Sequence, residues 1–482
     1  MSTEPMSGEP SNGDKQQRPR RRAVVRRRFR PSGSAVAAVV VLLLGVAAVL
    51  VAGARQPVPA EPPSAHGQPV TDVLAACQPG SHRARILTGS LPDPALGSTG
   101  SLAVRDLSSG ARKSVPLQRG RLTTLQPSDG VTALEATGPV AAGHFGMLVD
   151  PASGALAASP CVEPRSTWWF TGAGATLDHT SRLVIANVDP GPAVVDVRVL
   201  GESGPVSTIG TRGITIAPGA VRTIALTDIA PQGSDLSIQV QASRGRVAAA
   251  VSDSFASAPG AAAGKEWLPD QGAASRVVRI AATPSGSRHE TLLLANPTQL
   301  NALVGLRIEG KDGEFRPVQH AQIQVPPGST RAVDISDAVQ KQTGALLLHS
   351  RVPVLASLRS VSDGDLVYAG TVRPLEGAAA AAWGGGVHAK LLLTAGALPA
   401  TATVAAFDES GDQLGTDQLQ LAAGSTTSWK PPGRAEYLTV TPGHGAVYGS
   451  VLLSGPGSAE IRLDSPPVTL QRPVVQPGYS SP

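Results

Sequence analysis

The feature that most limits how this chain can fold is a pattern of glycine turns that recurs four times. Turns ending in Ser-Gly or Asp-Gly stand at Ser109-Gly110, Ser203-Gly204, Asp312-Gly313 and Ser410-Gly411. The glycines lie 94, 109 and 98 residues apart (110 to 204, 204 to 313 and 313 to 411). Each turn follows an apolar run and precedes a second glycine between apolar runs, at Gly120, Gly219, Gly328 and Gly424. The pattern predicts four units, each with its own β-hairpin.

Each unit of roughly 100 residues contains six or seven short apolar stretches separated by turn residues, a pattern typical of a β-sandwich. Aromatic residues make up only 3% of the chain, whereas there are 53 glycines and 42 prolines, which favours short strands of Val, Leu, Ile and Ala joined by turns. We therefore predict a mainly β protein with tandem immunoglobulin-like β-sandwich modules. The predicted modules cover residues 77–162, 163–260, 265–376 and 383–465.

An uncharged stretch of 19 residues, Ala35 to Gly53, precedes the repeats. As a helix rising about 1.5 Å per residue it spans the roughly 30 Å of a bilayer core. Its N-terminal flank holds eight arginines, and only Arg55 follows closely, so the positive-inside rule places residues 1–34 in the cytoplasm as a basic tail. Proline-rich segments at 54–76 and 466–482 are read as a linker and a C-terminal tail. We expect a single-pass cell-membrane protein with its large domain outside the cytoplasm.

Two other interpretations of this stretch remain open. Ala52-Gly53-Ala54 has the small residues of a signal-peptide cleavage site, and Arg26-Arg27-Arg28-Phe29 fits the start of a twin-arginine signal. The apolar run is longer than a usual signal sequence and the tail before it is long, which favours an uncleaved anchor.

The basic charge of the chain is confined to the tail. The sequence pI is about 9.5, and residues 1–34 hold nine Lys/Arg against three Asp/Glu. The remaining residues hold 41 − 9 = 32 basic and 36 − 3 = 33 acidic residues. The large domain has no basic excess, so we expect no nucleic-acid partner.

The sequence has only two cysteines, Cys77 and Cys161, and both fall on the predicted extracytoplasmic side. An even pair in an oxidising compartment predicts a disulfide. Two unpaired buried thiols are the alternative.

Several short motifs occur in a characteristic order: Thr167-Trp168-Trp169-Phe170-Thr171-Gly172, strands ending in Ala186-Asn187 and Ala295-Asn296, and a Ser-Arg-Val-Pro-Val turn at 350–354. Through them, residues 163–463 resemble an actinobacterial family catalogued as domain of unknown function 5719. The resemblance implies a secreted or membrane-anchored protein and no particular chemistry. Phe170 stands where the family pattern suggests a cysteine, so a family disulfide cannot be transferred.

No motif in the chain indicates catalysis or a cofactor. There is no Gly-x-Ser-x-Gly, His-Glu-x-x-His, Walker or Gly-x-Gly-x-x-Gly sequence, and no histidine has another within four positions. Asp178-His179-Thr180-Ser181 groups the residue types of a catalytic triad, but a triad forms in space, and a loop is the preferred interpretation. Asp408 to Asp412 has alternating oxygens, but Gly411 does not stand where a calcium loop needs it, so a hairpin turn is predicted.

We therefore expect a non-catalytic binding or scaffold protein of the cell envelope, with an envelope protein or glycan as its partner and no cofactor or metal. Trp168 and Trp169 are the candidate partner-binding residues, because neighbouring strand residues point to opposite faces and a partner could then reach one ring; packing of both rings in the core is the preferred interpretation. The alternatives are an envelope hydrolase or transferase with an unrecognised site, or an accessory subunit of a membrane glycosyltransferase.

Overall fold

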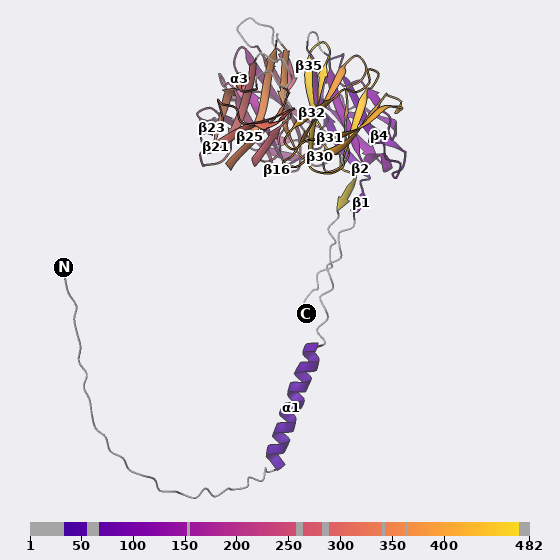
Figure 1. Ribbon diagram of the computed structural model, residues 1–482, viewed down its shortest axis with the longest axis vertical. Helices are drawn as coiled ribbons and strands as arrows, with labels where there is room; N and C mark the ends of the chain where they lie inside the picture. The colour runs from indigo at the N-terminus through magenta and orange to yellow at the C-terminus, as the bar shows by residue number, and fades with distance from the viewer. Residues whose placement is uncertain are drawn as a thin grey trace, which may run out of the picture. The chain divides into compact units, whose positions relative to one another are not determined.

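The computed structural model describes residues 33–54, 67–151, 155–256, 264–281, 289–339, 343–362 and 365–471. The chain divides into two units, residues 1–65 with 473–482, and residues 66–472. The first unit contains helix α1 (Gly33–Ala54), labelled in Figure 1. The predicted cytoplasmic tail 1–34, the linker 54–76 and the tail 466–482 lie largely outside the described residues.

The predicted membrane segment Ala35 to Gly53 lies within α1. The described side chains of this helix are those of residues 33–34 and 36–51. Over the described part of the chain, no helix is both long enough and apolar enough to cross a membrane.

The second unit is built from four consecutive modules of short strands. Module 1 comprises β2 (Asp72–Cys77), β3 (Arg85–Ser90), β4 (Thr99–Asp106), β5 (Arg112–Gln118), β6 (Thr123–Leu125), β7 (Thr132–Thr137), the 3-10 turn η1 (Pro139–Ala141), β8 (His144–Asp150) and β9 (Ala157–Pro160). Module 2 comprises β10 (Thr167–Ala173), β11 (His179–Ala186), β12 (Ala193–Gly201), β13 (Gly204–Pro205), β14 (Ile214–Ile216), β15 (Val221–Ala225), α2 (Leu226–Ile229), β16 (Leu236–Arg244), β17 (Ala248–Phe255) and β18 (Gly264–Trp267).

Module 3 comprises β19 (Ser275–Ile280), β20 (His289–Asn296), β21 (Ala302–Gly310), β22 (Gly313–Phe315), β23 (Gln322–Val325), β24 (Ser329–Asp334), α3 (Ser336–Val339), β25 (Ala345–Ser362), β26 (Asp365–Ala369) and β27 (Thr371–Val372). Module 4 comprises β28 (Ala379–Ala382), β29 (His388–Ala395), β30 (Ala400–Phe407), β31 (Gln413–Leu421), β32 (Thr426–Trp429), β33 (Tyr437–Pro442), β34 (Val447–Ser454) and β35 (Ser458–Arg462).

All four modules have the same two-sheet topology. In module 1 the first sheet has the order β2-β7-β4-β5 and the second has the order β6-β3-β8-β9. Module 4 repeats this as β28-β33-β30-β31 and β32-β29-β34-β35, and module 2 repeats it with β10-β16-β12-β13 and β15-β11-β17-β18. In module 3 the 18-residue strand β25 belongs to both sheets, pairing with β19 and β21 through its first half and with β20 and β26 through its second. The repeat seen in the sequence is therefore a repeat of the whole module.

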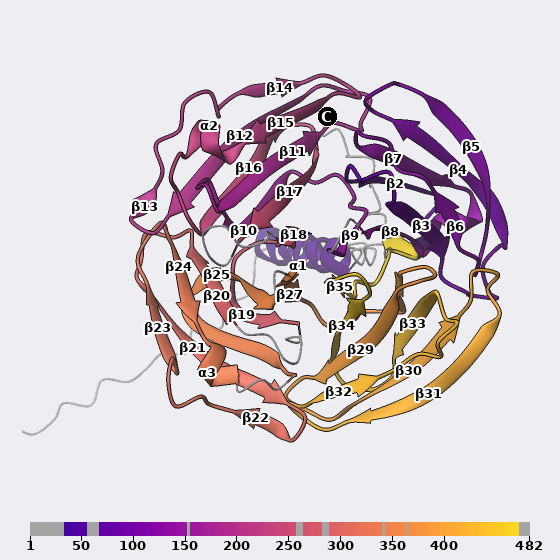
Figure 2. The ribbon, with the colours of Figure 1, turned by 90° about the horizontal axis from the view of Figure 1, so that it is seen from above.

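The modules close into a ring, as Figure 2 shows. The first sheet of each module packs on the second sheet of the next: Ala76 and Ala133 on Val184 and Ala248 between modules 1 and 2, and Trp169 on Ala295 between modules 2 and 3. Thr426 of module 4 bonds the Glu309 carbonyl of module 3, and Phe407 and Tyr437 of module 4 share a core with Phe145 and Met147 of module 1. The result is eight sheets placed like the blades of a β-propeller.

One strand of each module lies innermost: the last strand in modules 1, 2 and 4, and β26, which precedes the two-residue β27, in module 3. Strands β9, β18, β26 and β35 contact one another in this order, and β35 returns to β9. They surround the centre of the ring seen in Figure 2.

The two ends of the ring are joined by a separate ribbon. Strand β1 (Gly67–Pro69) pairs antiparallel with β36 (Thr469–Gln471), with Gly67 opposite Gln471. Next to it, the Val70 amide donates to the Val468 carbonyl at 3.0 Å. The first and last described strands of the unit therefore leave it side by side (Figure 1).

The recurring glycines have a common backbone reason. The eight glycines that define the repeat all have positive φ, from 58° at Gly424 to 123° at Gly204. L-residues with a side chain rarely adopt this conformation, so glycine is required at the hairpin turn and before the outermost strand of the second sheet. The hairpin predictions are confirmed, including the one at Asp408 to Asp412, where the Asp412 amide donates to the Asp408 carboxylate at 2.9 Å.

The mainly β class and the sandwich modules are confirmed, but three details are wrong. In module 1, for example, β8 pairs with β3 and not with β7, the strand that comes before it in the chain. The topology is therefore not that of an immunoglobulin domain. The Ser350 to Val354 turn is the middle of β25, where Pro353, which has no amide to donate, sits at the passage from one sheet to the other. Strand β28 lies in the gap between the predicted modules 265–376 and 383–465, because its four alanines are buried in the core of module 4.

Candidate functional site

Four segments, the three that link successive modules and the one that follows module 4, meet around the ring axis and line one pocket; we call them the four connections. The pocket has a volume of about 660 Å³, and its wall includes Cys161 to Arg165, Asp270 to Ala273, Arg373-Pro374 and Asp464 to Pro467. Each of these segments follows the innermost strand of one module. We call this hollow the axial pocket; its size is that of a small-molecule site.

The wall of the axial pocket combines apolar and charged groups. The apolar part includes Met147, Val277, Pro374, Tyr448 and Pro467. Val277 is 52% exposed, so the pocket presents apolar surface to solvent.

A chain of three charged residues joins the connections. The carboxylate of Asp270, which is buried, accepts from Arg165 and, at 2.9 Å, from Nη2 of Arg462. Burial alone would raise the pKa of Asp270, but Arg462 and Arg165 outweigh it and hold that pKa below its usual value. Arg462 also bonds Asp464 at 2.6 Å, and Arg165 stacks on the Trp168 ring at 3.7 Å. We call Arg165, Asp270 and Arg462 the Asp270 ion chain.

A second ion pair contributes Arg279 to the pocket wall, which also includes His144. Arg279 bonds Glu309 through two nitrogens at 2.6 and 2.8 Å and stacks over Tyr448 at 4.0 Å. His144 is buried against the Thr88 hydroxyl at 2.8 Å, and burial lowers its pKa to about 4, so the imidazole is neutral at pH 7. Neither group is arranged to transfer a proton to an occupant of the pocket.

Two buried carboxyl groups lie on the innermost strands. Glu266 of β18 accepts from the amides of Ala158 and Trp267, whereas among the described residues Glu460 of β35 has only the Ser450 hydroxyl near it, and the two do not form a hydrogen bond of normal geometry. Burial raises the pKa of both groups well above the ordinary value, which favours their neutral forms. Glu460 lines a cavity of about 30 Å³ next to Asp270 and Arg462, which is large enough for a water molecule.

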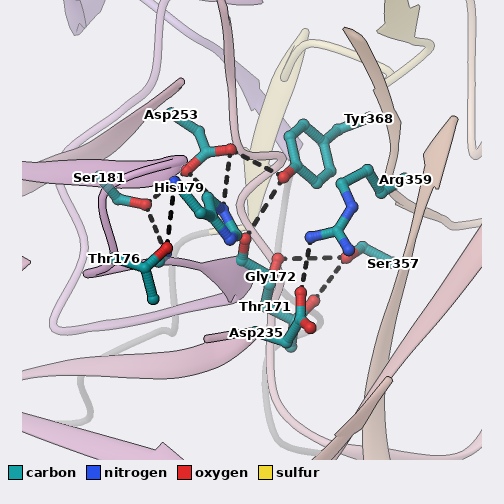
Figure 3. A network of polar contacts seen from close by, with 11 residues as sticks. Thr171, Gly172, Thr176, His179, Ser181, Asp235, Asp253, Ser357, Arg359 and Tyr368 are labelled. Carbon is teal, nitrogen blue, oxygen red and sulfur yellow. Dashed lines mark hydrogen bonds and ion pairs between the residues drawn. The ribbon is translucent and has the colours of Figure 1, made fainter. Parts of the chain in front are cut away.

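The residues that resemble a catalytic triad form a closed cluster between modules 2 and 3 (Figure 3). Asp253 accepts from His179 Nε2 at 3.1 Å, from the Ser181 hydroxyl at 2.5 Å and from the Tyr368 hydroxyl at 2.8 Å. Ser181 and His179 both turn to the carboxylate, so the base does not stand between acid and nucleophile as a triad requires. The Asp253 side chain is fully buried. We call these four residues the Asp253 cluster and assign it to packing.

The loop predicted for Asp178 to Ser181 is therefore only partly right. The Thr176 hydroxyl accepts from the His179 amide at 3.1 Å in the turn, but His179 already begins β11. The strand begins early because its first side chains are held by the partner strand β17, which carries Asp253.

Trp168 and Trp169 pack in the interior, as the preferred interpretation expected, and the alternative of a partner-binding role is wrong because both rings are buried. Trp168 is completely inaccessible and donates from Nε1 to the Val247 carbonyl at 2.8 Å. Trp169 is 7% exposed and packs with Leu200, Ala295 and Leu355 at the contact with module 3. The two rings do point to opposite faces of β10, but each face is covered, one by the sandwich core and the other by the next module.

The predicted disulfide is present. Cys77 and Cys161 are bonded, which ties the first strand of module 1 to the first connection. Among the described residues, no group of three His, Cys, Asp or Glu side chains is arranged to hold a metal ion.

The Ala-Asn motifs also have a structural explanation. Asn187 and Asn296 are completely buried at the ends of β11 and β20. Each donates to the carbonyl of a nearby loop residue, Gly191 or Leu300, and to the carbonyl at the end of a neighbouring strand, Ile216 of β14 or Val325 of β23. Each carboxamide thereby ties the loop after its own strand to a neighbouring strand.

Motif searching missed the residues of the axial pocket, since arginine and aspartate after a strand match no catalytic signature. The available signal was their position: Arg165, Asp270, Arg373 and Arg462 each lie at or just after the end of the last strand of a repeat.

The fold and the pocket define a class of protein: a closed ring of four β-sandwich modules with a mixed polar and apolar hollow on its axis. The chain belongs to the family of unknown function DUF5719, whose pattern matches residues 131–432. The match begins at the end of module 1 and ends after β32, so it covers modules 2 and 3 completely.

No curated protein matches the chain. Among solved structures, it is similar to the crystal structure of Streptomyces avermitilis α-L-rhamnosidase complexed with L-rhamnose, at 12% identity and a TM-score of 0.13. The alignment covers 82% of this chain and 57% of that one, so the chain spans less than two thirds of the rhamnosidase. A likeness of this strength carries no argument about function.

Proposed function

We propose that this protein is a single-pass, membrane-anchored protein of the cell envelope that binds a ligand or partner without chemical conversion, through the axial pocket. The observation that carries the proposal is the convergence of all four connections on one hollow. Segments separated by about 100 residues each contribute to the same wall.

The chemistry of the wall supports binding over catalysis. The carboxylate of Asp270 is engaged by two arginines, Arg279 is engaged by Glu309, and His144 is neutral and held by Thr88. A general acid or base needs a proton that it can exchange with the substrate near pH 7, and these groups are committed to protein partners.

The sequence supports the anchor and the location. Ala35 to Gly53 is uncharged, and the eight arginines before it set the orientation. The Cys77–Cys161 disulfide fits an oxidising compartment outside the cytoplasm.

Site-specific photo-cross-linking of the full chain in its native membrane tests the binding role. A photoreactive residue in place of Val277, which is exposed in the axial pocket, is expected to capture the occupant. The matched control is Ile209, which is 93% exposed and does not line the pocket. Equal cross-linking at both positions would contradict the proposal, because the occupant would then have no preference for the axis.

A protease-protection experiment tests the anchor. In intact cells the ring should be accessible from outside, and the full-length mass with the arginine-rich tail should be recovered. A mature N-terminus near Arg55 would show that the apolar segment is a cleaved signal and not an anchor.

A further inference from the structure

Arg373 differs from the other charged groups that the connections bring to the axis. The first and second connections supply Arg165 and Asp270, and β35 ends in Arg462; together with Asp464, which bonds Arg462, the two arginines and two carboxylates compensate one another's charge. The third connection supplies Arg373, which is exposed in the same pocket. Within the described residues, Arg373 has neither an ion-pair partner nor a hydrogen-bond partner.

No other carboxylate of the pocket is available to Arg373. Asp464 is bonded to Arg462, and Glu163 interacts electrostatically with Arg246 and Arg165. The positive charge of Arg373 therefore faces the hollow of the pocket without compensation.

The backbone holds Arg373 in place although its side chain has no polar partner. Val372 before it pairs with Arg279 of β19, and Pro374 after it fixes the next φ angle. Arg373 is thus a residue with little backbone freedom at the wall of the axial pocket.

Gly272 of the second connection makes room for the guanidinium. A Cβ built on Gly272 would lie 2.0 Å from Nη2 of Arg373, so any side chain at position 272 would displace that group. Gly272 is not among the glycines with positive φ. Space for the arginine, and not backbone strain, is the reason that the structure gives for glycine here.

We propose that Arg373 is the anion-recognition residue of the axial pocket and that the pocket takes a small ligand with a phosphate or carboxylate group. The planar guanidinium donates two parallel hydrogen bonds to such a group, and the apolar wall around Val277 and Tyr448 contacts the rest of the ligand. The inference rests on the binding role proposed above and specifies its ligand class. A free or glycan-borne acid and a lipid headgroup share this chemistry.

Calorimetric titration of the full chain in nonionic detergent tests the inference. The probes are glucose 1-phosphate and glucuronate, with glucose as the neutral counterpart. We expect both acids to bind at least about tenfold more tightly than glucose, and the difference to shrink at high salt.

Four variants assign the effect to Arg373. Arg373→Gln should weaken binding of both acids about tenfold or more. Arg373→Lys keeps the charge but loses the planar guanidinium, so its affinity should lie between those of the wild type and Arg373→Gln. Gly272→Ala should also weaken binding, because it moves the guanidinium. Arg112→Gln, an exposed arginine of β5 outside the pocket, is the matched control and should bind as the wild type does.

A competition arm identifies the source of the acidic group. If micelles doped with phosphatidylglycerol displace glucose 1-phosphate and those doped with phosphatidylcholine do not, the anion is a lipid headgroup; if neither does, it is a soluble or glycan-borne acid. Acid binding no tighter than glucose binding, or equal behaviour of Arg373→Gln and Arg112→Gln, would overturn the inference. Selective cross-linking at Val277 would still stand in that case, so the two failures are distinguishable.

Discussion

Asp253 and Asp270 are both buried carboxylates that join different modules, yet they are stabilised by opposite kinds of partner. Asp253 is surrounded by a histidine, a serine and a tyrosine from modules 2 and 3, and it is sealed between them. Asp270 is bound by two arginines that come from the first connection and from the end of β35, and these arginines line the axial pocket.

The difference shows that residue type is a poor guide to function in this ring. The Asp253 cluster contains the three side chains of a serine hydrolase, but its hydrogen bonds all end on one carboxylate that no substrate reaches. The Asp270 ion chain contains no catalytic signature, but it forms part of the wall of the axial pocket. Position relative to the axis, and not composition, separates the structural site from the binding site.

The largest expected effect on stability comes from removing the charge of the Asp270 carboxylate. Asp270→Asn leaves Arg165 and Arg462 without their carboxylate, and removing one partner of a buried ion pair costs about 3 to 5 kcal/mol. Urea denaturation of the full chain measures the loss. Asp189→Asn is the control, because Asp189 pairs with Arg246 at the surface and should cost less than about 1 kcal/mol. Similar losses of unfolding free energy for both variants would show that the Asp270 ion chain does not behave as a buried ion pair.

A smaller effect is expected in the Asp253 cluster. Tyr368→Phe removes one donor to Asp253 and should lower the free energy of unfolding by about 1 to 3 kcal/mol, leaving glucuronate binding unchanged. Ser243→Ala removes an exposed hydroxyl and serves as the control. If Tyr368→Phe abolished binding or a cellular activity without a change in stability, the cluster would be a functional site after all.

The smallest effect concerns a third buried carboxyl, that of Glu460, which has no charged partner and no hydrogen bond of normal geometry among the described residues. Burial raises the pKa of Glu460 well above 4.5, so its contribution to stability is complete below pH 4.5 and is lost as the pH rises toward the folded-state value. Between pH 5 and pH 6 the wild type should lose at most about 1.4 kcal/mol of stability through this group.

Glu460→Gln should reduce that slope, whereas substitution of the exposed Glu135 by Gln should not. Urea midpoints at the two pH values provide the measurement. An unchanged slope in Glu460→Gln would mean that the carboxyl finds a partner or solvent.

The features predicted correctly are those that the backbone and composition of the chain determine. The features that were missed arise from packing between modules. The glycines at 110, 204, 313 and 411 identified the repeat because only glycine adopts their φ angles readily. Cys77 and Cys161 were found because no other cysteine competes for them.

The burial of Trp169 and the pocket around Arg373 depend on neighbouring modules. Trp169 lies on a face that an isolated sandwich would expose, and it is covered only because module 3 packs there. Arg373 becomes part of a site only where four connections meet. Neither fact is visible in a single repeat, since the contacts that decide both lie about 100 residues away in the chain.

The pairing of β1 with β36 imposes an order on how the molecule is assembled. Synthesis delivers the N-terminal module first, and residues 469–471, which complete the ribbon with residues 67–69, come last. Until module 4 arrives, the second sheet of module 1 presents Phe145 and Met147 to solvent without the Phe407 and Tyr437 face that covers them in the finished ring. The nascent protein therefore exposes an apolar surface during most of its synthesis. A chain that ends before module 4 should aggregate instead of folding as a shorter ring.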